Sequence, residues 1–285
     1  MKAGQPSRTA LGAAGHRAAH QVLERGFIFA DPLAVRILGA ESGEFIARAA
    51  ADPSSRKLRL FIAVRTRVAE DALVAALSGG IRQVVVLGAG LDTFSYRHPV
   101  PEHVRIFEVD HPATQEWKRK RLADVAIPVP TALTFAPVDF EREALGSGLE
   151  RAGFDPHQRT FFSWLGVVPY LTRPAVLETL RYVANISAGG EVVFDYANPP
   201  PASAQIGDAT DHEALAERVA SVGEPFHTYF ETELLLATLV SLGLADVEDL
   251  GPDQIRARFF ANYRGNSGNN RGGHIVRAAS ARRCC

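Results

Sequence analysis

Some residue types are scarce in this sequence, which has 2 cysteines, 1 methionine and few lysines among its 31 basic residues. The cysteines, Cys284 and Cys285, are the last two residues. A frayed chain end cannot cross-link a fold. We therefore expect two free thiols and a fold that is stabilised by its hydrophobic core. The bias toward arginine carries no functional weight.

Long hydrophobic runs and a strong net charge are also missing. No stretch holds the roughly 18 uninterrupted apolar residues of a membrane helix, and residues 1–20 lack the apolar core of a signal peptide. We therefore expect a cytoplasmic protein without a membrane partner. The formal net charge of -1 provides no field that would hold a polyanion, so nucleic acid is a poor candidate partner.

Several catalytic motifs are absent. The sequence has no GxSxG, P-loop, HExxH or CxxC pattern, and no tyrosine is followed four residues later by the lysine that short-chain dehydrogenases require. His16 and His20 have the i, i+4 spacing of metal ligands on a helix. No acidic third ligand is expected beside them, so we predict no metal site.

The composition, 46% hydrophobic and 22% charged, is that of a globular chain with one large domain or two closely joined ones. Residues 1–80 have apolar positions at helical spacing, which predicts an N-terminal helical cap. In residues 81–285 short β-branched runs alternate with helical segments, which predicts a parallel sheet between helices. The predicted strands are 83–87, 105–110, 133–139, 159–167, 191–197, 245–250 and 272–279, with a helix near 231–242.

Three further features belong to this core. Thr172, before Pro174, is predicted to cap a helix. The basic run 118–121 lies late in another helix, where cations interact favourably with the helix dipole, so we interpret it as structural. We predict that residues 198–230 form a lid that shares the acceptor pocket with the cap.

The first predicted strand ends in a glycine turn, Gly88, Ala89 and Gly90. Glycine lets a backbone pass close to a ligand, although such a turn can also be purely structural. The next strand carries Glu108 and ends at Asp110, about 20 residues on, where an acid can accept the ribose hydroxyls of an adenosine cofactor. The two features together predict an adenosine ligand.

The residues after the turn help to choose between two adenosine-containing cofactors, a dinucleotide and S-adenosylmethionine. A dinucleotide site uses a third glycine and a long helix that faces the pyrophosphate. Here Thr93 takes that glycine's place, and Pro99 and Pro101 leave room for about a turn and a half of helix. S-adenosylmethionine has no phosphate and fits better. An NAD(P)-dependent oxidoreductase on a Rossmann-like fold and a non-catalytic cofactor-binding protein remain the alternatives.

Several stretches resemble a known family. They are "SRTAL" at 7–11, "DPLA" at 31–34, "VRTR" at 64–67, "VVVLGAGLDTFSYR" at 84–97, "FEVDHP" at 107–112, "PVDF" at 137–140, "FFSWLGVVPYLT" at 161–172 and "RGGHIVRA" at 271–278. The chain resembles the leucine carboxyl methyltransferase-like group of S-adenosylmethionine-dependent O-methyltransferases, which includes bacterial and polyketide-tailoring members. The resemblance implies a class I methyltransferase α/β fold: a Rossmann-like, mostly parallel seven-stranded sheet with helices on both faces and the N-terminal cap.

The resemblance also implies a cofactor site. Gly88, Ala89 and Gly90 would lie under the methionyl part of S-adenosylmethionine, and Asp110 would bind the ribose. The adenine would be framed by Asp139 and Phe140. For these acids the alternatives are structural: Asp110 as a helix cap and Asp139 as a loop cap.

The amino-acid end of the cofactor would be held by other residues. Arg65 would bind the carboxylate, with Arg8 as a possible second contact. The alternative is that Arg65 is a surface charge and Arg67 its substitute. Many members carry Glu where this chain has Leu165, which leaves the ammonium to backbone carbonyls, Ser163 or another acid. Trp164 keeps the aromatic character of that segment, although a core role is the alternative.

The resemblance implies methyl transfer to a carboxylate or hydroxyl of a small molecule, in secondary-metabolite biosynthesis. Such a transfer is an in-line displacement that depends mainly on alignment. A carboxylate acceptor needs no base, whereas a phenol would profit from one. The candidate catalytic residues are His212, His227 and Tyr170; the alternative for each histidine is a solvated surface residue.

Overall fold

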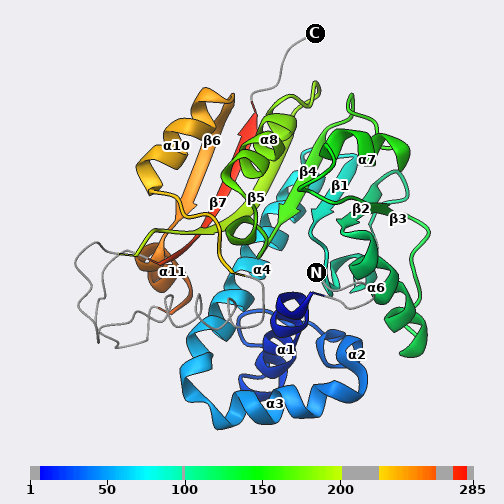
Figure 1. Ribbon diagram of the computed structural model, residues 1–285, viewed down its shortest axis with the longest axis vertical. Coiled ribbons are helices and arrows are strands. Elements are labelled where there is room, and N and C mark those ends of the chain that lie inside the picture. The colour runs from blue at the N-terminus through cyan, green and yellow to red at the C-terminus, as the bar shows by residue number, and fades with distance from the viewer. Residues whose placement is uncertain (1–6, 98–99, 201–224, 261–271, 281–285) are drawn as a thin grey trace.

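The structure of the protein, a computed structural model, describes residues 7–97, 100–200, 225–260 and 272–280. Its centre is a seven-stranded sheet with the strand order β3-β2-β1-β4-β5-β7-β6 (Figure 1). β7 runs antiparallel to both of its neighbours, and the other strands are parallel to one another. The strands are β1 Gln83–Leu87, β2 Arg105–Asp110, β3 Leu133–Pro137, β4 Thr160–Trp164, β5 Gly190–Ala197, β6 Leu244–Leu250 and β7 Gly273–Ser280.

All seven predicted strands are confirmed, and two end earlier than predicted. β4 ends at Trp164 because Gly166, at φ +70°, turns the chain out of the extended conformation. β3 ends at Pro137, two residues before Asp139, whose carboxylate and carbonyl organise the following turn. Polar turns therefore set the carboxyl ends of these strands.

Helices cover both faces of the sheet. On one face pack α7 Leu145–Arg151, α8 Arg173–Ala184 and α10 Thr232–Ser241, and on the other pack α4 Arg56–Ser78 and α11 Pro252–Phe259. β1 shows why. Val85 and Leu87 belong to the hydrophobic core under α7, α8 and α10, while Val84 and Val86 belong to the core under α4 and α11. A strand that is buried on both faces alternates between two cores and reads as a continuous apolar run.

The helices before β1 form a separate group at the carboxyl ends of the parallel strands (Figure 1). They are α1 Arg8–Leu23, α2 Ala34–Leu38 and α3 Ser42–Ala51, and the long α4 leads from them to the sheet. α1 and α2 pack through small and aliphatic side chains on Leu91, after β1, and on Leu122 of α6 Pro112–Asp124. The predicted division at residue 80 stays a prediction, because α4 packs on the sheet as well as joining the cap.

The helix starts follow local chemistry. Ser7 is the N-cap of α1 and accepts a hydrogen bond from the N–H of Ala10, and Pro112 occupies the first turn of α6, where a proline is tolerated. Thr172 occupies the predicted N-cap position of α8, but its side chain makes no capping bond. Its hydroxyl donates instead to Oε2 of Glu141, 3.4 Å away. Among the described residues no helix is long and apolar enough to cross a bilayer.

The basic run 118–121 lies in α6, and one of its residues has a buried role that the sequence analysis did not predict. Lys118 is 1% exposed, and its Nζ lies 2.7 Å from Oε2 of Glu108, which has no exposed surface. Tyr96 donates its hydroxyl to the same oxygen. Burial raises the pKa of Glu108, and the Lys118 ammonium opposes that rise. The run therefore contributes one cation to the interior.

Lys118→Met should lower the free energy of unfolding by about 3 kcal/mol, because it leaves the Glu108 carboxylate buried without its cation. Lys120→Met is the matched control: Lys120 lies on the same helix, and its Nζ is also 2.7 Å from a carboxylate, that of Asp124, but the pair is exposed. The control should cost less than about 1 kcal/mol. Chemical denaturation of the variants measures both values, and equal losses would contradict the assigned role of Lys118.

Candidate functional site

The glycine turn after β1 lies at the carboxyl edge of the sheet, between α1 and the loop after β4. Gly88 and Gly90 have φ values of +62° and +43°, in the left-handed region. A Cβ on Gly88 would lie 2.3 Å from Cγ2 of Val167, and one on Gly90 would lie 3.1 Å from Cβ of Ala10. The protein's own packing therefore requires small residues here, in addition to any ligand.

Asp110, at the end of β2, holds this turn. Its Oδ2 accepts the N–H of Gly90 at 2.5 Å, and its Oδ1 accepts the N–H of His111 at 2.7 Å. His111, and not Asp110, is the N-cap residue of α6. Burial raises the pKa of Asp110, and the two N–H groups oppose that rise. Each carboxylate oxygen keeps a lone pair for a hydroxyl donor, whereas Glu108 is committed to Lys118.

Asp139 lies beside this acid, after the neighbouring strand. Its Oδ1 accepts the N–H of Glu141, so the loop-capping role is present in the structure. Its Oδ2 lies 3.8 Å from Nε2 of His111, the residue that follows Asp110. Phe140 packs, partly buried, against the core cluster on that side. The pairing of β2 with β3 thus brings both predicted acids to one place, while the adenine contact stays a prediction.

Arg65, on α4, is anchored beside the loop after β4. Its Nη1 donates to Oδ2 of Asp195 at 2.8 Å, and its side chain is 12% exposed. A Cβ on Gly166 would lie 2.5 Å from Nη2 of Arg65, so the guanidinium rests against the glycine backbone. Arg65 is therefore no surface charge. That description fits Arg67, which is exposed and paired with Asp71 on its own helix.

Asp195 was not predicted from the sequence. It lies on β5, is 4% exposed, and accepts the N–H of Gly166 at 2.5 Å through its second oxygen. A signal for it exists in the sequence, because it is an acid inside the buried strand Gly190–Ala197. A buried carboxylate of this kind requires donors from elsewhere in the fold.

Two buried donors near this loop have no hydrogen-bond partner among the described residues, Nε1 of Trp164 and Nε of Arg65. A guanidinium carries five N–H donors in one plane, and Asp195 takes the donor of only one nitrogen. Buried polar groups are normally satisfied. Arg65 therefore keeps an unused donor beside this loop.

The other predicted site residues differ in their burial. Trp164 has no exposed surface and packs against Phe194, so the core role is present in the structure, while its contact with the cofactor stays a prediction. Ser163 and Ala89 lie near the strand ends, Ser163 half-buried and Ala89 buried. Arg8 is exposed on the first turn of α1.

Two of the three catalytic candidates, Tyr170 and His227, lie among the described residues, close to the segment after β4. The ring of Tyr170, half-buried after β4, lies edge-on to Phe226 with centroids 5.1 Å apart. His227 is exposed, and its backbone N–H donates to the carbonyl of Pro169. His212 and most of the predicted lid, with both cysteines, lie outside the described residues.

An acid lies beside the histidines that were considered as metal ligands. Nδ1 of His20 lies 3.3 Å from Oε2 of Glu24, so an acid does stand near the histidines, and it is also bound by Arg59. Within residues 7–97, 100–200, 225–260 and 272–280, no group of three His, Cys, Asp or Glu side chains is placed to hold a metal ion.

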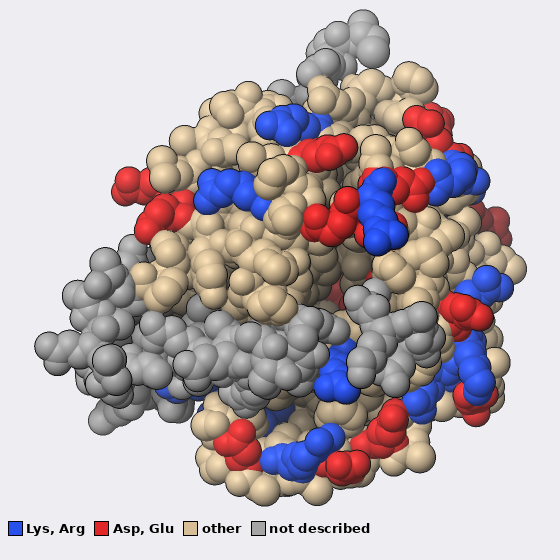
Figure 2. Space-filling view, in the orientation of Figure 1, with Lys and Arg blue, Asp and Glu red and all other residues tan. Residues whose placement is uncertain are grey.

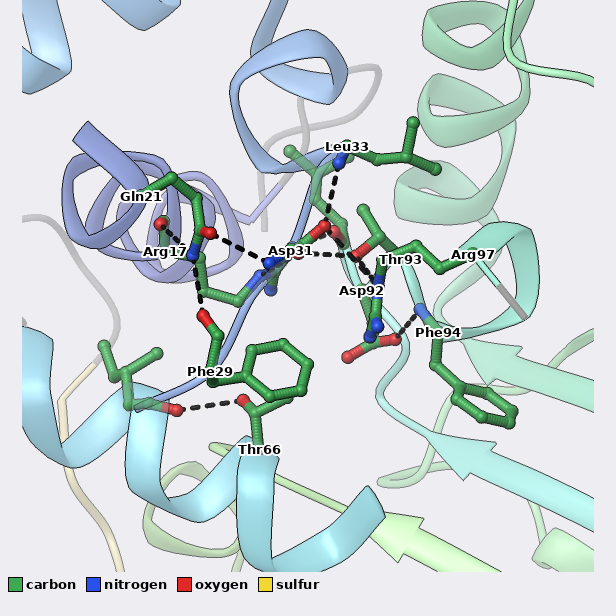
Figure 3. A network of polar contacts seen from close by, with 12 residues as sticks. Arg17, Gln21, Phe29, Asp31, Leu33, Thr66, Asp92, Thr93, Phe94 and Arg97 are labelled. Atoms are coloured by element: carbon green, nitrogen blue, oxygen red, sulfur yellow. Dashed lines mark hydrogen bonds and ion pairs between the residues drawn. The ribbon is translucent and has the colours of Figure 1, made fainter. Parts of the chain in front are cut away.

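A buried polar network fastens the helical cap to the glycine loop (Figure 3). Its centre is Asp31, 1% exposed, which accepts the hydroxyl of Thr93 at 2.6 Å and lies within ion-pair distance of Arg17 and Arg97. Arg97 also pairs with Glu70 of α4. Thr93, the residue in place of the third glycine, and Arg97, at the end of α5 Phe94–Arg97, thus connect the turn to the cap. The short helix predicted after the turn is confirmed.

The network contains more carboxylates than guanidiniums. Glu70, Asp31 and Asp92 face Arg17 and Arg97, and one proton would balance the charges. Burial raises the pKa of Glu70 to about 7, Arg97 opposes the rise, and the two aspartates add to it. Glu70 therefore binds a proton more tightly in the folded chain than in the unfolded chain, where its pKa is about 4.5.

The contribution of Glu70 to stability should fall with rising pH. It is fully present below pH 4.5 and is lost through pH 7, which amounts to about 3 kcal/mol. Chemical denaturation of the wild type and Glu70→Gln at several pH values isolates this term. The wild-type free energy of unfolding minus that of the variant should decrease from pH 4.5 to pH 8. A difference that stays constant, or grows, would contradict the raised pKa.

The chain matches the leucine carboxyl methyltransferase family over residues 10–184. YktD of Bacillus subtilis, a candidate S-adenosyl-L-methionine-dependent methyltransferase, is 38% identical over 204 residues, or 71% of this chain and 66% of YktD. A candidate methyltransferase of the same type from Mycobacterium marinum is 38% identical over 152 residues, or 52% of this chain and 50% of that protein. The chain thus matches between half and two thirds of these relatives' length.

Among solved structures, the CurJ carbon methyltransferase superposes with a TM-score of 0.51 over 96% of this chain and 68% of that one. The two sequences are 16% identical, so the likeness concerns the fold alone. Together with the strand order, it confirms the predicted class I methyltransferase architecture.

Proposed function

Because this chain belongs to the leucine carboxyl methyltransferase family, we propose that it binds S-adenosylmethionine at the carboxyl ends of β1, β2 and β4 and methylates an oxygen of a small molecule. The observation that carries the proposal is the bond between Asp110 and the glycine turn. This bond holds Asp110 beside the glycine turn, which supports assigning the ribose hydroxyls to Asp110 and the methionyl part to the turn. The named relatives support the choice of cofactor.

The residues of the site fit this cofactor and do not fit a dinucleotide. Asp110 would accept the ribose hydroxyls, Asp139 lies one strand further out for the adenine, and the orphaned Nε of Arg65 would donate to the amino-acid carboxylate. A diphosphate would need the N-terminus of a sustained helix. α5, after the turn, has only 4 residues.

When bound, the sulfonium supplies an activated methyl group. The task of the chain is then to hold the acceptor oxygen in line with that methyl group and to exclude water, and such alignment supplies roughly 7 to 11 kcal/mol. A carboxylate acceptor is already ionised at neutral pH, so no protein base is required. We favour a carboxylate acceptor, with a hydroxyl as the second choice, because the family description names a carboxyl group.

A small acceptor also agrees with the surface. On the face shown in Figure 2, acidic and basic side chains alternate without a continuous area of one sign. The net charge of -1 leads to the same expectation. Such a surface has no field for steering a polyanion. We therefore propose a small-molecule acceptor, and we keep the hypothesis that the predicted lid, residues 198–230, encloses it.

Isothermal calorimetry should show binding of S-adenosylhomocysteine, the demethylated cofactor, at micromolar concentration. Asp110→Asn should weaken it about ten- to hundredfold, because the amide is a poorer acceptor for the ribose hydroxyls. Asp124→Asn, an exposed change on α6, is the control and should bind normally. Gly88→Val is unsuitable, since it would displace Val167. Heat with NAD or NADP, or none with S-adenosylhomocysteine, would refute the proposed cofactor.

Alkaline treatment of the labelled product identifies the acceptor group. With S-adenosylmethionine that carries a tritiated methyl group, a carboxylate acceptor gives a methyl ester, which releases volatile labelled methanol at high pH. A methyl ether keeps its label under the same conditions. We expect labelled methanol when carboxylic acids are offered as acceptors. If the label instead stayed on phenols after alkaline treatment, a hydroxyl and not a carboxylate would be the preferred acceptor.

A further inference from the structure

Asp195 occupies a special place in the sheet. The strand order 3-2-1-4-5 changes direction between β1 and β4, and ligands of such sheets bind at this switch point. β5 lies beside β4, with Phe194 opposite Trp164, so Asp195 adjoins the first residues beyond the end of β4. The first of these residues is Leu165, at which an acid was expected from the family.

Both oxygens of Asp195 are used, and for different purposes. Oδ1 accepts the N–H of Gly166, which fixes the backbone just after Leu165, and Oδ2 accepts Nη1 of Arg65. Arg65 lies on α4 and Gly166 follows β4, so one carboxylate joins two elements that are far apart in the sequence. A guanidinium that is already paired has less rotational freedom to lose when it binds a further group, because its N–H groups form a planar, rigid fork.

The same contact reaches the glycine turn through the loop. Gly166 lies against the guanidinium of Arg65, and the next residue, Val167, fills the space above Gly88. A carboxylate that fixes Gly166 therefore also fixes the side chain that packs on the turn. Arg65 Nε remains buried and without an acceptor among the described residues, at the side of the pair that Asp195 does not use.

We propose that Asp195 is the positioning residue of the amino-acid end of the cofactor site. It acts through Arg65, whose remaining N–H groups it aims at the cofactor carboxylate, and it supplies the negative charge that Leu165 does not. This inference rests on the proposed function. Asp110 and Asp195 then flank the switch point, one from β2 for the ribose and one from β5 for the amino-acid end.

Asp195→Asn tests the proposal with little change in volume. The amide oxygen can still accept the Gly166 N–H, but the amide nitrogen would then face Nη1 of Arg65, donor against donor. Two probes separate positioning from general damage. S-adenosylhomocysteine has the amino-acid end, whereas 5′-methylthioadenosine has the same adenosine and sulfur without it. Calorimetry should show affinity for the first probe falling about ten- to hundredfold, and affinity for the second unchanged.

Glu191→Gln is the matched control. Glu191 lies on the same strand, at its other end, and also pairs with an arginine, Arg277, at 2.7 Å. Its loss should leave the affinities for both probes unchanged. Arg65→Gln closes a double-mutant cycle: in that background Asp195→Asn should have no further effect on S-adenosylhomocysteine binding, because the group through which it acts is gone.

Other outcomes overturn the inference. Equal loss of both probes would mean that Asp195 is merely structural, and unchanged or tighter S-adenosylhomocysteine binding would mean that it does not position Arg65. If Asp195→Asn does not fold, Arg65→Lys replaces it, since lysine keeps the charge but loses the planar fork. That variant should show the same split between the probes, and an equal effect on both would overturn the inference. Failure of the wild type to bind either probe would instead refute the proposed function.

Discussion

The turns after the two central strands depend on carboxylates from the strands beside them. The turn after β1 gives the N–H of Gly90 to Asp110 of β2, and the turn after β4 gives the N–H of Gly166 to Asp195 of β5. Parallel strands that are buried on both faces leave polar groups only at their ends, where backbone donors must find acceptors. The buried Asp195 and the half-buried Asp110 meet that requirement on either side of the switch point, and the candidate site lies between them.

The limited exposure of these acids makes the surrounding contacts specific. A carboxylate that is shielded from water needs donors of fixed geometry, and each of the two receives two backbone or side-chain N–H groups. The helical cap is attached by the same kind of contact, through Asp31, Thr93 and the two arginines beside them. Because Thr93 lies just after the glycine turn, the packing of the cap and the shape of the site are parts of one structure (Figure 3).

Much of the core could be predicted from sequence periodicity. The strands were found because buried strands are short, β-branched and bounded by turns, and the short helix after Gly90 followed from the prolines near 99–101. The position of Asp110 at the end of β2 was predicted correctly, because a single crossover connection from β1 to β2 sets its distance along the chain from the glycine turn. The burial of Lys118 was not predicted, because a cation within a basic run gives no local sign of a buried partner on a strand.

The sequence by itself determined the order of the elements, the glycine turn and the acid at the end of β2, since each depends on local backbone conformation or on a fixed spacing along the chain. Only the tertiary structure decided which polar groups meet. Arg65 and Asp195 are 130 positions apart, and no periodicity connects them. It also decided that Trp164 belongs to the core and that Val167 and Ala10 fill the space beside the glycines, because the packing of separate elements determines such contacts.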